Sequence, residues 1–128
     1  VTGDRVAMRT ILETVRELGL FFMDSRTSSR SVVLAVAAEL GLPVGRNDLF
    51  IDNEPDVEII KTQLRAGLNL ARRQGRAVVI GHVRPATADA LWAMLPELLS
   101  SGVQLVPISQ LLFIPAVPGD DTEPVLPQ

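Results

Sequence analysis

The sequence contains no cysteine and only one histidine among its 128 residues. Without cysteine the chain can form no disulfide, no thiolate metal site and no cysteine nucleophile. Aromatic side chains are also scarce, with one tryptophan and four phenylalanines, so the chain offers no platform on which bases could stack. Because the net charge is −3 and the basic residues are scattered, we expect no nucleic acid as a partner.

Long apolar runs are missing as well. The longest is far too short to cross a bilayer, so we expect this segment not to span a membrane. The first residues lack the basic, apolar and small-residue regions of a signal peptide, so no targeting segment is recognised in this chain. A length of 128 residues with 47% apolar residues is instead typical of one globular domain with a single hydrophobic core.

What the sequence does contain is an alternation between helical and strand-like hydrophobic spacing. Asp4 is of the residue type that begins a helix, and the hydroxyl cluster at 27–29 is expected to cap a second helix. Glycines are placed to end helices, and Pro96 is expected to kink the last one. Helices are expected at 6–18, 33–40, 57–71 and 88–98, and strands at 20–23, 48–51, 77–80 and 103–108.

The expected strands are apolar at nearly every position. Such strands are buried on both faces, which indicates a parallel sheet covered by helices. We therefore predict an α/β fold, a parallel β-sheet with alternating helices, for residues 1–114. From residue 115 the chain is rich in proline and acidic residues, and we expect residues 115–128 to form a disordered tail.

Polar residues gather where three of the expected strands end. Ligands of parallel α/β folds bind at the carboxyl ends of the strands, so we expect these side chains to lie on one rim. Each also has a structural interpretation: the aspartates as caps or turn formers, the first arginine as an ion-pair partner, and the histidine as a hydrogen-bonded structural residue. The residues are Asp24 and Arg26, Asp52 and Asn53, and His82 and Arg84.

Recognised catalytic motifs are lacking around this rim. The single histidine and the scattered carboxylates have no zinc-ligand spacing, and the glycines lie at helix ends rather than in a phosphate-binding loop. The serines of the DSRTSSRS stretch are not surrounded by a G-x-S-x-G motif, so a serine hydrolase is disfavoured.

A family resemblance is carried by three stretches: FFMDSRTSSRS at 21–31, DLFIDN at 48–53 and VVIGHVRPATADALWAMLPELLSSGVQLVPISQL at 78–111. In this order and spacing they resemble the C-terminal half of the divergent polysaccharide deacetylases, bacterial envelope proteins related to metal-dependent carbohydrate esterases. The resemblance covers residues 4–112. It implies the C-terminal half of a distorted (β/α) barrel of the polysaccharide deacetylase type, with the active site at the carboxyl ends of the strands.

The resemblance also implies roles for three catalytic residues. His82, in VVIGH followed by SGVQLVPIS, corresponds to the family's catalytic histidine, a general acid that protonates the leaving amine. Asp52 takes the place of the aspartate that orients a catalytic partner, and Arg26 that of an active-site arginine. Val83 departs from the Gly-His-Pro that is usual in the family, although Pro85 still ends the turn.

The remaining implications concern the substrate and the metal. Asp24, Asn53 and Arg84 are expected to bind a carbohydrate substrate. The family's metal ligands lie upstream, on strands that this chain does not contain. We therefore expect no metal site in this chain, and a divalent ion, zinc above all, held by the full-length parent.

The resemblance implies that this chain is part of a longer protein that removes acetyl groups from envelope or cell-surface carbohydrate by metal-dependent hydrolysis. It implies that this protein is located in the bacterial envelope or periplasm. This chain alone is expected to be inactive. The first alternative is a catalytically inactive envelope module of the same fold that binds carbohydrate or acts as a scaffold. The second is an unrelated α/β domain that binds a phosphorylated metabolite at the same rim.

We also expect the chain to be a fragment. Four buried parallel strands flanked by helices leave a sheet edge and an apolar face uncovered, and such surfaces pair with other chains. The missing N-terminal half of the same domain, or a second copy of this chain, is the expected partner for that surface.

Overall fold

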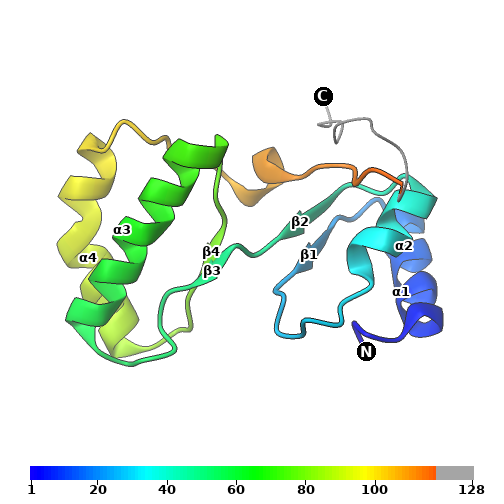
Figure 1. Cartoon of the computed structure of the whole chain (residues 1–128), viewed down its shortest axis with the longest axis horizontal. Coiled ribbons are helices and arrows are strands. Elements are labelled where there is room, and N and C mark those ends of the chain that lie inside the picture. Colours follow the sequence, from blue (N-terminus) through cyan, green and yellow to red (C-terminus); the bar gives the residue numbers. More distant parts are fainter. Residues whose placement is uncertain (118–128) are drawn as a thin grey trace. The chain divides into compact units, whose positions relative to one another are not determined.

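The computed structural model describes residues 1–117. They form two compact units, one of residues 1–46 and 108–117, the other of Asn47–Pro107. Each unit contains two α-helices and one pair of short parallel strands (Figure 1). The mixed α/β composition is as predicted, but the strands form separate two-stranded sheets rather than one continuous sheet.

The first unit rests on helices α1 (Arg5–Glu17) and α2 (Val33–Leu40), which pack against each other. The predicted cap of α1 is confirmed, since the Asp4 carboxylate accepts hydrogen bonds from the backbone N–H groups of Val6 and Ala7. The predicted cap of α2 is wrong. Its N-cap is Val32, without a side-chain bond, because the hydroxyl cluster at 27–29 ends too early to reach the first turn.

The strands of the first unit are β1 (Phe22–Asp24) and β2 (Val44–Arg46), paired in parallel. The expected strand at 20–23 begins later than predicted, because Leu20 and Phe21 are exposed. Strand β2 was not predicted. An antiparallel bridge between Val44 and Phe113 adds the segment that follows the 3-10 helix η1 (Ile108–Leu111).

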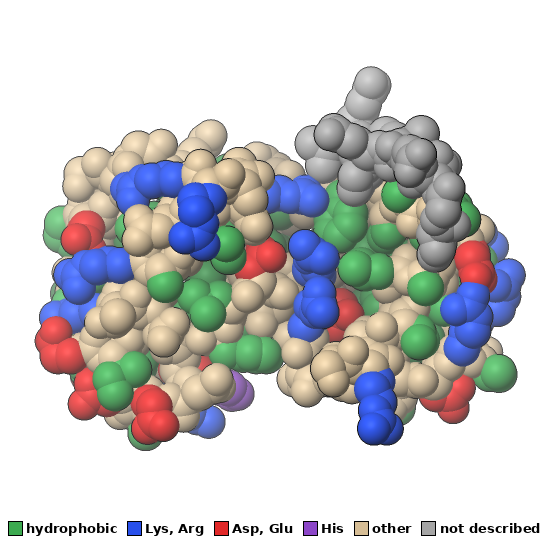
Figure 2. All heavy atoms as spheres, in the orientation of Figure 1, with side chains coloured by type: hydrophobic (Ala, Val, Ile, Leu, Met, Phe, Trp, Pro, Cys, Tyr) green, Lys and Arg blue, Asp and Glu red, His purple; other side chains and the backbone are tan. Residues whose placement is uncertain are grey.

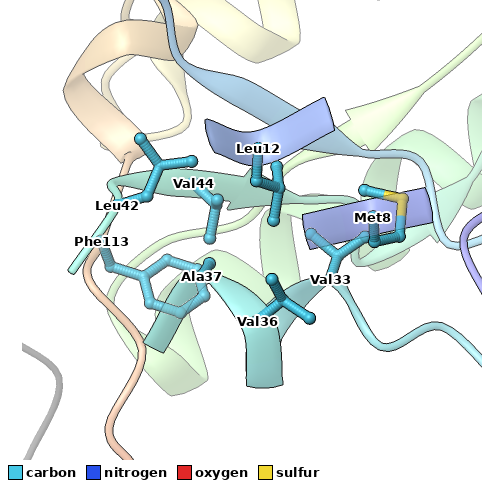
Figure 3. Packing of buried hydrophobic residues seen from close by; sticks show 8 residues of the cluster. All are labelled: Met8, Leu12, Val33, Val36, Ala37, Leu42, Val44 and Phe113. Atoms are coloured by element: carbon cyan, nitrogen blue, oxygen red, sulfur yellow. The ribbon is translucent and has the colours of Figure 1, made fainter. Parts of the chain in front are cut away.

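The core of the first unit is formed by apolar side chains from both helices, from β2 and from the segment after η1. These side chains point toward one another from opposite sides of the cluster (Figure 3). A separate cluster fills the second unit, so the described residues have two cores rather than the single core expected. The members of the first core are Met8, Leu12, Val33, Val36, Ala37, Leu42, Val44 and Phe113.

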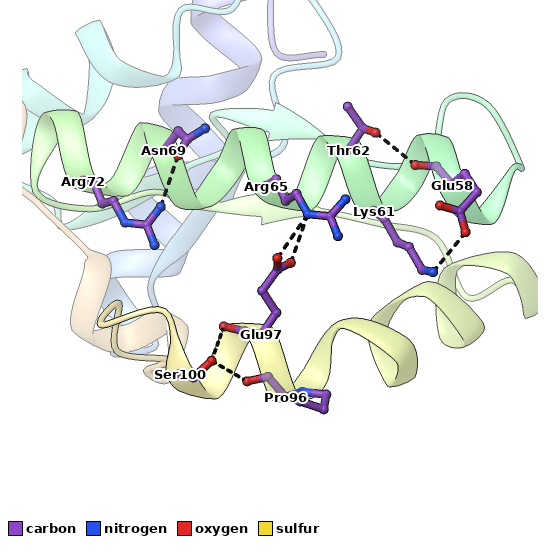
Figure 4. Close-up of polar contacts among 9 residues, drawn as sticks. All are labelled: Glu58, Lys61, Thr62, Arg65, Asn69, Arg72, Pro96, Glu97 and Ser100. Carbon is purple, nitrogen blue, oxygen red and sulfur yellow. Dashed lines mark hydrogen bonds and ion pairs between the residues drawn. The ribbon is translucent and has the colours of Figure 1, made fainter.

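The second unit contains β3 (Leu49–Phe50), α3 (Val57–Gln74), β4 (Val79–Ile80) and α4 (Pro85–Ser100). Helices α3 and α4 pack side by side, and the Arg65 side chain bonds Glu97 between them (Figure 4). Helix α3 ends at Gly75, as predicted, in the left-handed conformation that glycine adopts without strain. The core residues of the second unit are Ile51, Ile60, Leu64, Leu68, Ala90, Met94 and Leu98.

The predicted strand at 103–108 is wrong. Residues 103–107 are irregular, and η1 begins at Ile108. Leu105 is 56% exposed, and Pro107 has no N–H group to donate to a neighbouring strand. The predicted tail at 115–128 lies, after its first three residues, outside the described part of the chain.

Helix α4 begins earlier than predicted, because Pro85 at its first position has the backbone angle that a helix start requires. It continues through Pro96 to Ser100. None of the helices within residues 1–117 is both long and apolar enough to cross a membrane. On the face seen in Figure 2, basic and acidic side chains are interspersed rather than gathered by sign.

Candidate functional site

The candidate site of the second unit is created by the parallel pairing of β3 with β4. Phe50 lies opposite Ile80, and the N–H of Ile51 donates to the carbonyl of Ile80 at 3.0 Å. When the same register is followed past the strands, Asp52 comes opposite His82. The pairing thus brings together two side chains that are far apart in the sequence.

The opposite end of the same strand pair is closed by Asp48. Its backbone N–H donates to the carbonyl of Val78 at 2.8 Å, and its Oδ2 accepts the N–H of Val78 at 2.8 Å. The side chain thus takes the place of a backbone carbonyl. Because both bonds join the same two residues, they fix the register of two very short strands.

Asp52 is fully buried, and three donors satisfy its carboxylate. Oδ2 accepts the backbone N–H of His82 at 2.5 Å and the hydroxyl of Thr87 at 2.6 Å. Oδ1 lies 2.8 Å from Nδ1 of His82. A buried charged group requires such partners, and here one comes from a backbone and two come from side chains.

These contacts determine the charge of Asp52. Burial alone raises the pKa of the carboxyl group, because the ionised form loses its hydration. The hydrogen bonds from Thr87 and from the side chain and backbone of His82, with the positive charge that His82 can carry, outweigh burial. The pKa of Asp52 falls from 3.8 to about 2, so the group is ionised at neutral pH.

The ionised state of Asp52 fixes the role of His82. A carboxylate can only accept hydrogen bonds, so Nδ1 of the imidazole must carry the proton in the 2.8 Å contact. In the neutral ring the lone pair is then on Nε2. The His82 side chain is 51% exposed, so one edge of the imidazole is held by the protein while the ring reaches the surface.

Arg84 and Asn53 lie next to this pair. The Arg84 guanidinium donates to the backbone carbonyl of Asp52 at 3.2 Å, and the backbone N–H of Arg84 donates to the carbonyl of His82 at 2.9 Å. Arg84 is also the N-cap residue of α4. Asn53 is exposed and directly follows Asp52.

Asp24 and Arg26, the other predicted site residues, belong to the first unit. Asp24 is buried; its Oδ1 accepts the backbone N–H of Arg26 at 2.9 Å, and its Oδ2 accepts the hydroxyl of Ser31 at 2.7 Å. The Arg26 backbone has a φ of 55°, in the left-handed region, and its side chain is exposed. Asp24 thus fixes the loop between β1 and α2.

Two functional candidates of the second unit were not predicted from the sequence. Thr87, in the first turn of α4, is 4% exposed and donates to Asp52. Gly81 packs against Thr87. A Cβ atom at Gly81 would come within 3.0 Å of Cγ2 of Thr87 and 3.1 Å of the Ile51 side chain. Pro85 marks the helix start and so places Thr87 in the first turn, but no signal in the sequence marks Thr87 or Gly81 as part of a site.

A metal ion has no evident place among these residues. Across residues 1–117 no three histidine, aspartate or glutamate side chains are grouped so that they could hold a metal ion. His82 and Asp52 are already bonded to each other. The donor set present in the described chain therefore does not fit a metal centre.

Comparison with known proteins places these features in context. A family described as divergent polysaccharide deacetylase matches residues 1–112. An uncharacterized protein of Haemophilus influenzae is 34% identical over 110 residues, which are 86% of this chain and 39% of that protein. The uncharacterized protein YibQ of Escherichia coli is 30% identical over 117 residues, 91% of this chain and 36% of its own length.

A solved structure is also similar. The uncharacterized protein ATU2773 from Agrobacterium tumefaciens C58 matches with a TM-score of 0.81 over 84% of this chain and 44% of its own. At 22% identity, this likeness concerns the fold alone. The chain spans less than half the length of each of these relatives.

Proposed function

Because this chain belongs to the divergent polysaccharide deacetylase family, we propose that it is part of a protein that hydrolyses acetyl groups from envelope or cell-surface carbohydrate. The observation that supports this best is the buried, ionised Asp52 that holds Nδ1 of the half-exposed His82. Such a pair orients an imidazole and stabilises its protonated form. The proposal includes a distorted (β/α) barrel for the longer protein, located in the bacterial envelope or periplasm.

His82 has the chemistry of the general acid. Cleavage of an acetamide requires a proton on the departing amine, and an imidazolium can deliver it from Nε2 while Nδ1–H stays bonded to the carboxylate. Asp52 remains ionised throughout, because its pKa is about 2. Its negative charge stabilises the imidazolium before the proton is transferred.

The exposed polar residues are proposed to bind the sugar. Arg84 and Asn53 follow the two paired strand ends and offer donors to hydroxyl or acetyl oxygens. For Asp24 and Arg26 of the first unit, the predicted substrate-binding and catalytic roles rest on the family resemblance alone. Because the described donor set does not fit a metal centre, the divalent ion of this proposal, zinc above all, would be held by parts of the longer protein outside this chain.

The test is the release of acetate from N-acetylated and O-acetylated oligosaccharides by the full-length parent protein. His82→Gln should lower kcat by about 10²- to 10⁴-fold, the usual contribution of a general acid. Glu58→Gln, an exposed change in α3, is the matched control and should leave the rate unchanged.

Two results would contradict the proposal. Equal rates for wild type and His82→Gln would exclude this histidine as the general acid. A wild-type protein that binds acetylated glycan but releases no acetate would instead support the non-catalytic envelope module.

A further inference from the structure

Thr87 is the donor to Asp52 that the proposed reaction does not use. Its hydroxyl donates to Oδ2 at 2.6 Å, and the same oxygen accepts the backbone N–H of His82 at 2.5 Å. Of the three donors found within residues 1–117, two therefore meet Oδ2, and Nδ1 of His82 is the one that meets Oδ1. The division of donors determines which carboxylate oxygen faces the ring.

The direction of the Thr87 hydroxyl is itself fixed by packing. The residue is 4% exposed, and its Cγ2 methyl is so close to Gly81 that a Cβ atom there would lie 3.0 Å away. A β-branched side chain has few χ1 rotamers, so contact at the methyl also sets the hydroxyl. The absence of a side chain at Gly81 gives Thr87 the space for this rotamer.

A carboxylate without such donors is free to rotate, because the torsion that turns its two oxygens has a broad energy profile. The backbone N–H of His82 supplies one restraint on Oδ2, and Thr87 supplies the second from a different element, α4. Loss of the hydroxyl would let Oδ2 and Oδ1 share the remaining donors in more than one orientation. The bond from Nδ1–H of His82 to the carboxylate would then form only part of the time, and the Nδ1–H tautomer would lose its advantage over the Nε2–H tautomer.

We propose that Thr87 is a positioning residue: through Asp52 it keeps the neutral His82 ring in the Nδ1–H tautomer, with Nε2 available to the substrate. The use of Nε2 in acetyl hydrolysis rests on the function proposed above. The tautomer of the ring does not, so it can be measured without a substrate.

Nitrogen NMR of the imidazole provides the test, and because the chain has one histidine every ring signal belongs to His82. Spectra are recorded in alkaline buffer, where an ordinary imidazole is neutral. Wild type should show the Nδ1–H tautomer as the main form. Thr87→Val, which removes the hydroxyl at nearly constant volume, should lose that preference, and Thr87→Ser should retain it.

Thr62→Val is the matched control, because Thr62 belongs to the same unit and its hydroxyl donates to the Glu58 carbonyl of its own helix. A merely structural role for Thr87 would lower stability in Thr87→Val and leave the ring in the Nδ1–H form. That result in a folded variant would overturn the proposal. If the valine variant does not fold, Thr87→Ala removes the same hydroxyl without placing a second methyl beside Asp52, and the same criterion applies.

Activity gives a second readout in the full-length parent. Thr87→Val should lower kcat while KM stays near the wild-type value, and Thr87→Ser should restore kcat. A wild-type protein without deacetylase activity would contradict the proposed function, yet the NMR comparison would still decide whether Thr87 sets the tautomer.

Discussion

The two units of the chain each place a buried aspartate at the carboxyl end of a parallel strand pair, but the donors that surround the two carboxylates differ. Asp24 accepts a backbone N–H and a serine hydroxyl from its own loop. Asp52 accepts the backbone and the ring of His82, together with Thr87. The donors of Asp24 are a backbone amide and a hydroxyl, whereas one of the donors of Asp52 is an imidazole ring.

This difference shows that a buried aspartate after a strand does not by itself mark a chemical site. Around Asp24 the result is a fixed loop. Around Asp52 the result is a half-exposed imidazole with one nitrogen bonded and the other available. The identity of the donors, rather than the burial of the carboxylate, separates a structural role from a catalytic one.

Removal of the two carboxylates should give the largest effects. Asp52→Ala leaves the buried Thr87 hydroxyl and the His82 N–H without their acceptor and should lower the free energy of unfolding by about 2–5 kcal/mol. Asp24→Ala should lower it by about 1–3 kcal/mol, because its loop donors can turn toward water. Urea denaturation measures both, and a larger loss for Asp24→Ala would reverse the comparison.

Acid should remove part of the Asp52 contribution. A group whose pKa is lower in the folded chain stabilises the fold above its unfolded pKa, and this stability is lost as the pH falls through the folded pKa. For Asp52 the window extends from about pH 4 down to about pH 2. The stability difference between wild type and Asp52→Asn should shrink across this window in urea titrations, and a constant difference would contradict the lowered pKa.

The addition of a methyl group at one glycine of each unit should give a smaller difference in stability between the units. Gly81→Ala would press a Cβ atom on Thr87 and Ile51 and should cost about 1–3 kcal/mol. Gly45→Ala in the first unit meets mainly the sulfur of Met23, which is 2.6 Å away but lies on a flexible side chain. It should cost less than about 1 kcal/mol. Thermal unfolding compares the two, and equal losses would show that Thr87 yields as easily as methionine.

Surface ion pairs should give the smallest effects. Glu39 bonds both Arg5 and Arg9 in the first unit, and Glu97 bonds Arg65 in the second (Figure 4). Glu39→Gln and Glu97→Gln should each change stability by about 1 kcal/mol or less, with the larger loss at Glu39, which has two partners. Repetition in high salt should reduce both losses, and an undiminished loss would point to packing instead of charge.

The helices could be predicted because their signals are local. Asp4 caps α1 and Gly75 ends α3 through bonds and angles that neighbouring residues determine. The strands depend on partners elsewhere in the chain. Strand β2 has only three residues, one of them glycine, and gives no periodic signal, whereas the aliphatic segment at 103–108 has the right composition but forms no strand.

The candidate site, too, could be predicted only in part. Asp52 and His82 each follow a strand, and the parallel pairing alone brings them opposite each other. Thr87 could not be identified, because a threonine in the first turn of a helix is ordinary in sequence. Only the packing of α4 against the strand ends directs its hydroxyl to Asp52. The role of Asp24 could not be read either, since a cap, a loop anchor and a ligand share the same residue type.

The bonds between Asp48 and Val78 have a consequence for chain length. The same number of positions separates Asp48 from Asp52 and Val78 from His82, so the two segments match from the closed end of the strand pair to the site. An inserted or deleted residue in one segment would move its last side chain to the other face and separate the carboxylate from the ring, although every functional residue is kept. The two segments should therefore change length only together. In an alignment of relatives, a gap in one segment alone would signal the loss of the Asp52–His82 pair more reliably than a substitution next to either residue.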